Sequence, residues 1–220
     1  LRGNITVDLE QERVSSNIAG TLGAEHIKRA SPESGFRRVL SHFADTTAQV
    51  SFNLHPSPYL PLEWRGEGTI EADHGTFEDV AFTGLAANVA LKHQALTVRI
   101  EHAATSKGTI EDATVAIDLP EVNLHIAGRA VADPRLFRIF VPRGDARHNY
   151  DRVWRGFEWG EKTSLPELEL TALDFFPNTG RMERWKLNLR GQITDDAVTY
   201  RGVTATRAQA TVNLELQGPG

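Results

Sequence analysis

The sequence predicts a mainly β protein of antiparallel meander repeats with two or three short helices, whose sheet either packs against a second sheet or curls into a groove. Most segments alternate apolar and polar residues at every second position, which is typical of strands with one buried face. Turn signals such as "HPSP", "ADHG", "SKG" and "FPNTG" separate these segments. Parts of the pattern also recur along the chain. Short turns between alternating segments favour antiparallel hairpins.

The alternating segments place their apolar residues in phase, and eight of these residues define one predicted sheet face. If the pairing register of a strand were wrong by one residue, every side chain of that strand would point to the opposite face of the sheet. The prediction that these residues share one face is therefore easy to refute. The eight are Val89, Leu91, Val98, Ile100, Ile117, Leu119, Leu124 and Ile126. The same alternation continues at Leu168 and Leu170, at Leu187 and Leu189, and at Val212, Leu214 and Leu216.

Three helices are predicted, at about Glu33–Phe43, Pro134–Phe140 and Ala146–Trp159. Ser34 is a suitable N-cap for the first, and Asp133 before Pro134 suits the start of the second. Two helices carry apolar residues at i, i+3, i+4 and i+7, which indicates one buried stripe each. The stripes are Phe36, Val39, Leu40 and Phe43, and Tyr150, Val153, Trp154 and Phe157. We expect them to cover an end or flank of the sheet.

The strand pattern is repeated within the chain. Residues 68–91, "GTIEADHGTFEDVAFTGLAANVAL", align without gaps with residues 191–214, "GQITDDAVTYRGVTATRAQATVNL", at a shift of 191 − 68 = 123. Two weaker similarities are also present. "ITVDL" at 5–9 resembles "VAIDL" at 115–119, at a shift of 110, and "NIAG" at 17–20 resembles "HIAG" at 125–128, at a shift of 108. Repeats of this kind indicate a repeat architecture. We expect residues 1–44 to end one repeat, 45–160 to form a full repeat and 161–220 to begin the next, within one continuous domain.

Composition and motifs argue against several classes of function. The chain has 220 residues, a net charge of −5, no cysteine and no basic stripe, so nucleic-acid binding is not expected. The densest polar group, Asp145, His148, Tyr150 and Asp151, lacks a nucleophile, and the histidines show no metal-ligand spacing. We therefore expect no enzymatic activity, no metal and no cofactor. We also expect the chain to be a segment of a longer protein.

The order of these parts resembles a known family. A strand ending in "HIAG" precedes the Asp133–Pro134 helix start, and "WRGEGTI" at 64–70 and "GTFEDV" at 75–80 open a meander that runs to "IDL" at 117–119. From Ile5 to Leu216 this order is similar to that of the AsmA-like superfamily, the YhdP/TamB-type envelope proteins of bacteria. The resemblance implies a periplasmic protein, anchored to the inner membrane in its parent, with an apolar β-groove that conducts phospholipids between the inner and outer membranes.

The predicted ligand is therefore a phospholipid or another acyl-chain lipid. An apolar face gains roughly 25 cal/mol per Å² when it leaves water, and a second sheet, helices or a lipid tail could cover it. Because so little helix is predicted, we expect another sheet or a lipid to cover most strands. The alternative is a structural or adhesive β-repeat with a dry core and no ligand. The predicted groove residues are Phe52, Leu54, Val89, Leu91, Val98, Ile100, Ile117, Leu119, Leu124, Ile126, Val212 and Leu214.

Aspartate substitutions at Leu91 and Ile126 separate the two hypotheses at the level of sequence. An unpaired carboxylate in an apolar environment costs several kcal/mol unless it protonates. A partly hydrated groove should keep its fold and lose co-purified lipid, whereas a dry core should unfold. Circular dichroism and lipid extraction of both variants measure the difference.

Overall fold

The computed structural model describes residues 2–23, 43–59, 63–118, 123–141, 144–159, 164–173 and 185–218. The chain divides into two compact units. The first unit comprises residues 1–105 and 114–123, and the second comprises residues 106–113 and 124–220. The predicted domain boundaries near residues 44 and 160 remain a prediction.

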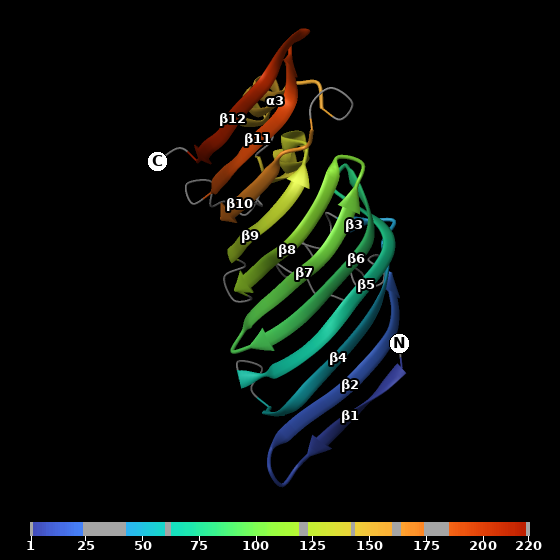
Figure 1. Ribbon diagram of the computed structural model, residues 1–220. Helices are drawn as coiled ribbons and strands as arrows, with labels where there is room; N and C mark the ends of the chain where they lie inside the picture. The colour runs from blue at the N-terminus through green and yellow to red at the C-terminus, as the bar shows by residue number, and fades with distance from the viewer. Residues whose placement is uncertain are drawn as a thin grey trace. The chain divides into compact units, whose positions relative to one another are not determined.

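The first unit contains seven described strands and shares an eighth with the second unit (Figure 1). These are β1 (Arg2–Asp8), β2 (Arg13–Gly23), β3 (Phe43–Ala44), β4 (Thr47–Pro58), β5 (Arg65–Phe77), β6 (Val80–Lys92), β7 (Ala95–Thr105) and the shared β8 (Gly108–Asp118). The second unit adds β9 (Asn123–Ala132), the 3₁₀ helix η2 (Pro134–Phe140), the α-helix α3 (Asp145–Trp154), β10 (Glu167–Leu173), β11 (Lys186–Tyr200) and β12 (Val203–Gln217).

The strands form an antiparallel meander, which confirms the predicted fold class. Within the first unit the order of neighbours is β1-β2-β4-β5-β6-β7, and β3 pairs with the end of β5. Within the second unit the order is β9-β10-β11-β12. Among the described strands, β1 and β12 each have a neighbour on one side only, so the sheet is not closed into a barrel.

The helices agree with the sequence prediction in part. Pro134–Phe140 is confirmed as η2, and the Asp133 side chain caps it by accepting a hydrogen bond from the Arg135 amide at 2.9 Å. The predicted helix 146–159 is found as α3 but ends five residues earlier, at Trp154. Backbone pairing stops it: the Glu158 amide donates to the Thr199 carbonyl, and the Arg201 amide to the Gly156 carbonyl. The predicted helix 33–43 lies outside the described residues except for Phe43, which begins β3.

The internal repeat corresponds to two hairpins with the same register. β5 pairs with β6, and β11 with β12, so that each residue pair of the first hairpin recurs 123 positions later. Gly68 opposite Val89 becomes Gly191 opposite Val212. In both hairpins the pairing is also interrupted at one position, where the residue of the second strand has a positive φ angle. These residues are Gly84 in β6, with φ 61°, and Arg207 in β12, with φ 56°. The 123-residue repeat is thus confirmed by the pairing.

The strands before these hairpins are also equivalent, and they correct one sequence alignment. Phe52 of β4 lies opposite Gly68 as Leu168 of β10 lies opposite Gly191, a shift of 168 − 52 = 116. On the next strand outward, Ile18 of β2 and Ala130 of β9 occupy the same place, a shift of 130 − 18 = 112. The predicted shift of 108 for "NIAG" and "HIAG" is therefore wrong by four residues. Because four is even, the error leaves the assigned faces unchanged.

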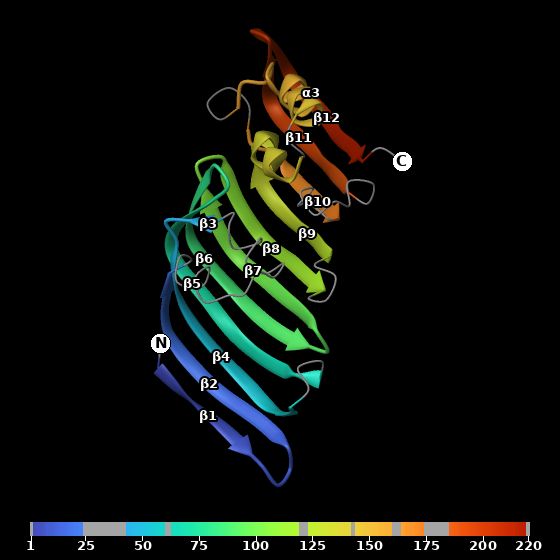
Figure 2. The same cartoon turned by 180° about the vertical axis from the view of Figure 1, so that it is seen from behind.

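In the second unit the two helices cover the apolar face of the sheet. Figures 1 and 2 show η2 and α3 on one side of β9–β12. Trp185, which alternates in phase with Leu187 and Leu189, donates a hydrogen bond from its indole to the Phe140 carbonyl at 2.8 Å. Leu187 and Leu189 are completely buried. The helices contribute Leu136, Phe137, Phe140, Tyr150 and Trp154 to this core. Two short helices therefore cover part of the sheet face in this unit. The expectation that another sheet or a lipid covers most strands of the chain stays a prediction.

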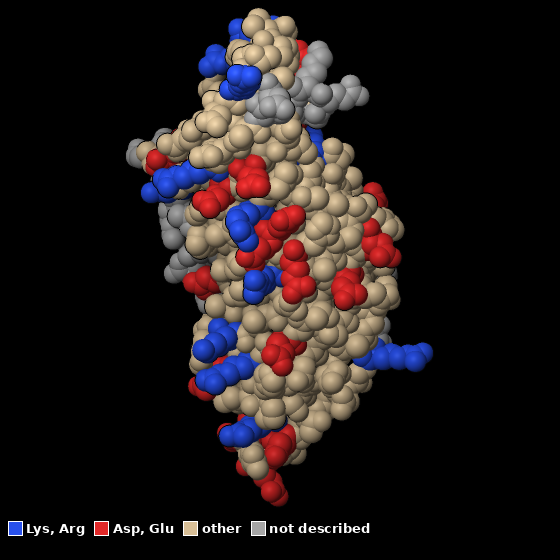
Figure 3. All heavy atoms as spheres, in the orientation of Figure 1, with Lys and Arg blue, Asp and Glu red and all other residues tan. Residues whose placement is uncertain are grey.

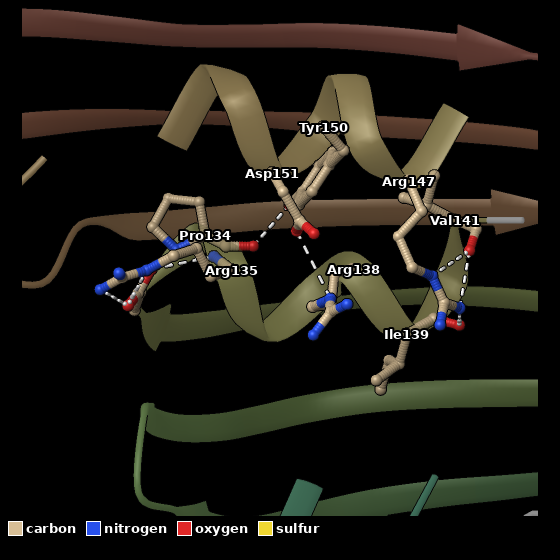
Figure 4. A network of polar contacts seen from close by, with 9 residues as sticks. Pro134, Arg135, Arg138, Ile139, Val141, Arg147, Tyr150 and Asp151 are labelled. Atoms are coloured by element: carbon tan, nitrogen blue, oxygen red, sulfur yellow. Dashed lines mark hydrogen bonds and ion pairs between the residues drawn. The ribbon is translucent and has the colours of Figure 1, made fainter. Parts of the chain in front are cut away.

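Polar contacts hold η2 against α3 (Figure 4). The Tyr150 hydroxyl donates to the Pro134 carbonyl, and the Arg147 guanidinium donates to the Val141 carbonyl at 2.8 and 3.0 Å. Arg138 lies 3.4 Å from Asp151. Burial raises the pKa of the Tyr150 phenol, and the nearby Asp133 carboxylate raises it further. The phenol therefore remains protonated and acts as a hydrogen-bond donor.

We expect Tyr150→Phe to lower the free energy of unfolding by about 1–3 kcal/mol, because it leaves a buried carbonyl without its donor. Tyr59→Phe is the matched control, since the Tyr59 hydroxyl also donates to a backbone carbonyl, that of Asp8, but Tyr59 is 41% exposed. Water replaces the lost donor there, so we expect a change within about 0.5 kcal/mol. Urea unfolding measures both values. Equal losses would contradict the structural role of Tyr150.

The raised pKa of Tyr150 also predicts a loss of stability at alkaline pH. In the unfolded chain the phenol releases its proton near pH 10, whereas in the folded chain it keeps that proton. Above about pH 10 the folded state thus binds more protons than the unfolded state, and the free energy of unfolding falls as pH rises. Below about pH 10 this contribution is complete. We expect Tyr150→Phe to show a shallower decline between about pH 9 and 11 than the unchanged chain. Parallel declines would contradict this explanation.

Candidate functional site

The candidate site is the apolar face of the first unit, formed by β2, β4, β5, β6 and β7. Residues directly opposite each other in adjacent antiparallel strands place their side chains on the same face. The registers therefore align three rows across β4–β7. The rows are Leu54, Gly66, Leu91 and Leu96; Phe52, Gly68, Val89 and Val98; and Val50, Ile70, Ala87 and Ile100. None of these residues is charged, so the face is continuous and aliphatic apart from one phenyl ring.

Most side chains of this face are partly exposed rather than buried. Val50, Phe52, Ile70, Val89, Leu91, Leu96, Val98 and Ile100 all fall between buried and exposed. On β1, Ile5 and Val7 belong to the same face through their pairing with Ser16 and Val14, and they are 68% and 54% exposed. In the second unit, by contrast, the equivalent face is completely buried at Leu187 and Leu189. The two units thus cover equivalent apolar faces to different degrees.

Two glycines of β5 reduce how far side chains project from the centre of this face. A Cβ atom at Gly66 would lie 2.6 Å from Cζ of Phe52, and one at Gly68 would lie 3.0 Å from its Cδ2. The Phe52 ring therefore lies flat along β5 over both glycines. This arrangement, in which an aromatic ring covers cross-strand glycines, keeps the centre of the face low and smooth.

The opposite face of the same strands is polar. The hydroxyls of Ser51 and Thr69 are 3.0 Å apart, and the Asn88 amide donates to Glu101 at 2.6 Å. In the view of Figure 3, acidic and basic side chains are interspersed on the surface, without one continuous patch of either sign. The sheet of the first unit therefore has one hydrated face and one apolar face.

The structure divides the predicted groove residues between the units. Six of them, all from β4, β6 and β7, share the apolar face of the first unit: Phe52, Leu54, Val89, Leu91, Val98 and Ile100. Ile117 is buried in β8, and Leu119 lies outside the described residues.

The remaining four predicted residues, Leu124, Ile126, Val212 and Leu214, belong to strands of the second unit, and all but Leu214 are buried. Ile126 lies opposite the completely buried Ala172, so it belongs to the core of the second unit rather than to the partly exposed face of the first. The outcome of Ile126→Asp stays a prediction.

Sequence reasoning missed several apolar residues of the first-unit face as site residues. Val50 and Leu96 belong to alternating segments that the sequence analysis identified, and the same alternation is present in β1, β2 and β5. The missed residues include Ile5, Val7, Ile18, Val50, Ile70 and Leu96.

The polar group on α3 has a structural role in the described residues. Tyr150 and Asp151 are engaged with η2, and Asp145 begins the helix. Among the described residues, no cluster of three or more His, Cys, Asp or Glu side chains could hold a metal ion. Within the same residues, no helix is both long and apolar enough to cross a membrane. That the chain has no enzymatic activity remains an expectation from the sequence.

Comparison of the chain with models of protein families, with curated proteins and with solved structures yields no match. The resemblance to the AsmA-like superfamily therefore rests on the order of sequence motifs alone.

A double-mutant cycle tests whether Phe52 lies over Gly66. We expect Gly66→Ala to destabilise the chain, because the new methyl group meets the Phe52 ring and the Asn53 carbonyl oxygen at 2.8 Å. In a Phe52→Leu background the ring is gone, so the same substitution should cost less, by about 0.5–3 kcal/mol. Denaturant unfolding of the four proteins gives this difference. Additive effects would show that the ring lies elsewhere.

Proposed function

We propose that the apolar face of the first unit binds the acyl chain of a lipid, and that the chain is a lipid-binding or lipid-conducting segment. The observation that carries this proposal is the difference between the units: the sheet face is largely buried beneath helices in the second unit, whereas most side chains of the equivalent face in the first unit are partly exposed. An acyl chain is the complement of a long, uncharged face, since it has no polar groups to leave unsatisfied. A phospholipid is the ligand class that the sequence resemblance suggests, and it would place the protein in the bacterial envelope.

The energetics of such a face favour lipid binding. Each methylene group transferred from water to an apolar surface contributes about 0.8 kcal/mol, so contact with several methylenes accumulates appreciable affinity. In the first two rows, the Phe52 ring and the side-chain-free positions Gly66 and Gly68 leave no large β5 side chain in the middle of the face. A flexible chain can therefore lie along the sheet.

The second candidate function is a structural or adhesive repeat with a dry core. The second unit favours it, because η2, α3 and Trp185 already bury the apolar face there. Under this alternative the face of the first unit would also be a folding core rather than a binding surface. The two functions differ in how the first unit responds to a charge on that face.

Leu91→Asp separates the two functions. Leu91 is partly exposed and lies opposite Leu96 in the first row. Under the lipid proposal we expect the variant to keep its strand content by circular dichroism and to lose most of its co-purified phospholipid, measured by extraction and mass spectrometry. Under the dry-core alternative the variant unfolds, since a buried unpaired carboxylate costs several kcal/mol.

Two further variants calibrate the experiment. Ala95→Asp adds the same charge beside the same row but on the polar face, opposite Lys92, so it should retain both fold and lipid. Leu187→Asp places the charge in the helix-covered core and should disrupt the second unit. Absence of phospholipid from the unchanged chain, together with unfolding of Leu91→Asp, would reject the proposed function.

A further inference from the structure

We propose that the turn between β11 and β12, together with the end of α3 that pairs with it, docks onto an anionic lipid membrane surface. We call this region the basic tip, and it comprises residues 151–159 and 199–204. The partner is defined by its chemistry: a layer of negatively charged headgroups above an apolar interior. This inference concerns the second unit and is independent of the acyl-chain site proposed for the first unit.

The basic tip contains a tight turn that projects from the sheet. Tyr200 lies opposite Val203 at the end of the hairpin, and the two loop residues, Arg201 and Gly202, have φ angles of 50° and 76°. Positive φ at both loop residues is typical of a type I′ hairpin turn. A Cβ atom at Gly202 would meet nothing within 4 Å apart from its chain neighbours, and the turn extends beyond α3 in Figures 1 and 2. Open space therefore surrounds the loop.

A series of aromatic rings anchors the tip in the core of the second unit. The buried rings of Tyr150 and Trp154 have centroids 6.2 Å apart. The Phe157 ring follows at 5.9 Å from Trp154, and the Tyr200 ring at 4.9 Å from Phe157. A Cβ atom at Gly156 would overlap the Tyr200 ring, so this ring also lies against the Gly156 backbone. Packing thus orients Tyr200 and still leaves it 39% exposed.

The exposed side chains of the tip are apolar or positively charged. Val203 is 72% exposed, and the Arg201 guanidinium lies 5.4 Å from the centre of the Tyr200 ring. The two acids of the tip, Asp151 and Glu158, are only partly exposed. In Figure 3 most charged side chains at this end of the second unit are basic. Every exposed charged residue of the tip is an arginine, although the chain has a net charge of −5: Arg152, Arg155 and Arg201.

An anionic membrane is the surface that this combination fits. Tyrosine and aliphatic side chains enter the region between headgroups and acyl chains, whereas arginine extends its charge toward the phosphates. Anionic lipids also attract basic residues that lie close to the membrane surface. An acidic protein segment would pair with the arginines, but it offers no apolar layer for Val203 and Tyr200.

The turn between β1 and β2 provides a comparison within the same chain. Leu9 in this turn is 79% exposed, so it resembles Val203 in presenting an aliphatic side chain to solvent. Its neighbours Asp8, Glu10 and Glu12 are acidic, however, and would be repelled by anionic headgroups. We therefore expect only the β11–β12 turn to dock.

The experiment measures co-sedimentation of the full chain with vesicles. One set contains phosphatidylglycerol and phosphatidylcholine in equal parts, and the other contains phosphatidylcholine alone. We expect binding to the anionic vesicles to be at least about fivefold tighter, because each arginine near an anionic surface contributes roughly that factor. Added salt should weaken it by screening.

Substitutions of exposed residues locate the binding surface. Arg201→Glu and Val203→Asp should each weaken binding to anionic vesicles at least about fivefold, whereas Arg201→Lys keeps the charge and should stay within about twofold. Leu9→Asp is the matched control for Val203→Asp, since it adds the same charge at an equally exposed aliphatic position, and it should also stay within about twofold. Circular dichroism checks that each variant keeps its strand content.

The outcomes separate this proposal from its alternatives. Equal binding to both sets of vesicles, or unchanged binding of Arg201→Glu and Val203→Asp, would overturn it. Binding of soluble polyglutamate in place of anionic vesicles, dependent on Arg201 but not on Val203, would overturn it in favour of an acidic protein partner. Val203→Asp should keep any phospholipid that co-purifies with the first unit, and absence of that phospholipid from the unchanged chain would leave the expected vesicle binding unaltered.

Discussion

The structure depends on one constraint: a single sheet of alternating strands has an apolar face that must be removed from water. Pairing between strands satisfies the hydrogen bonds of the peptide groups, but it does not remove the apolar face from water. In the second unit η2 and α3 cover it, and their position depends on buried polar contacts, including the Tyr150 hydrogen bond to the Pro134 carbonyl. In the first unit the described residues leave the equivalent face partly exposed. The functional proposal follows from this difference rather than from any catalytic arrangement.

The repeat explains why the two units can be compared residue by residue. The β5–β6 and β11–β12 hairpins share their register, their interruption beside a positive-φ residue and the glycine at the centre of the row. The neighbouring residue over that glycine differs: Phe52 lies flat over Gly68, and Leu168 lies over Gly191. The same backbone thus supports a smooth partly exposed face in one unit and a helix-covered core in the other.

The alternation of apolar and polar residues was sufficient to predict the fold class and the faces of individual strands. Successive side chains of a strand point to opposite faces of the sheet, so a period of two directly identifies the buried face. Thus Val89 and Val98 lie on one face as predicted. The position of η2 was also predictable from Asp133 and Pro134, whose preferences are local. The end of α3 was not predictable, since it depends on pairing between Gly156 and Arg201, which are far apart in sequence. Nor could alternation reveal that Ile126 and Leu91 have different environments, because helix cover is a tertiary property that leaves no periodic signal in the strand it covers.

The most direct test of the central claim measures which apolar methyl groups a lipid reaches. A stearic acid carrying a nitroxide spin label is added to the chain, and methyl NMR signals are followed. The account predicts strong broadening at Val89, Val98 and Ile100 on the face of the first unit, and none at Leu187 or Leu189 beneath the helices. Broadening of both sets to the same extent, or of neither set, would contradict the claim that the two units cover equivalent faces in different ways.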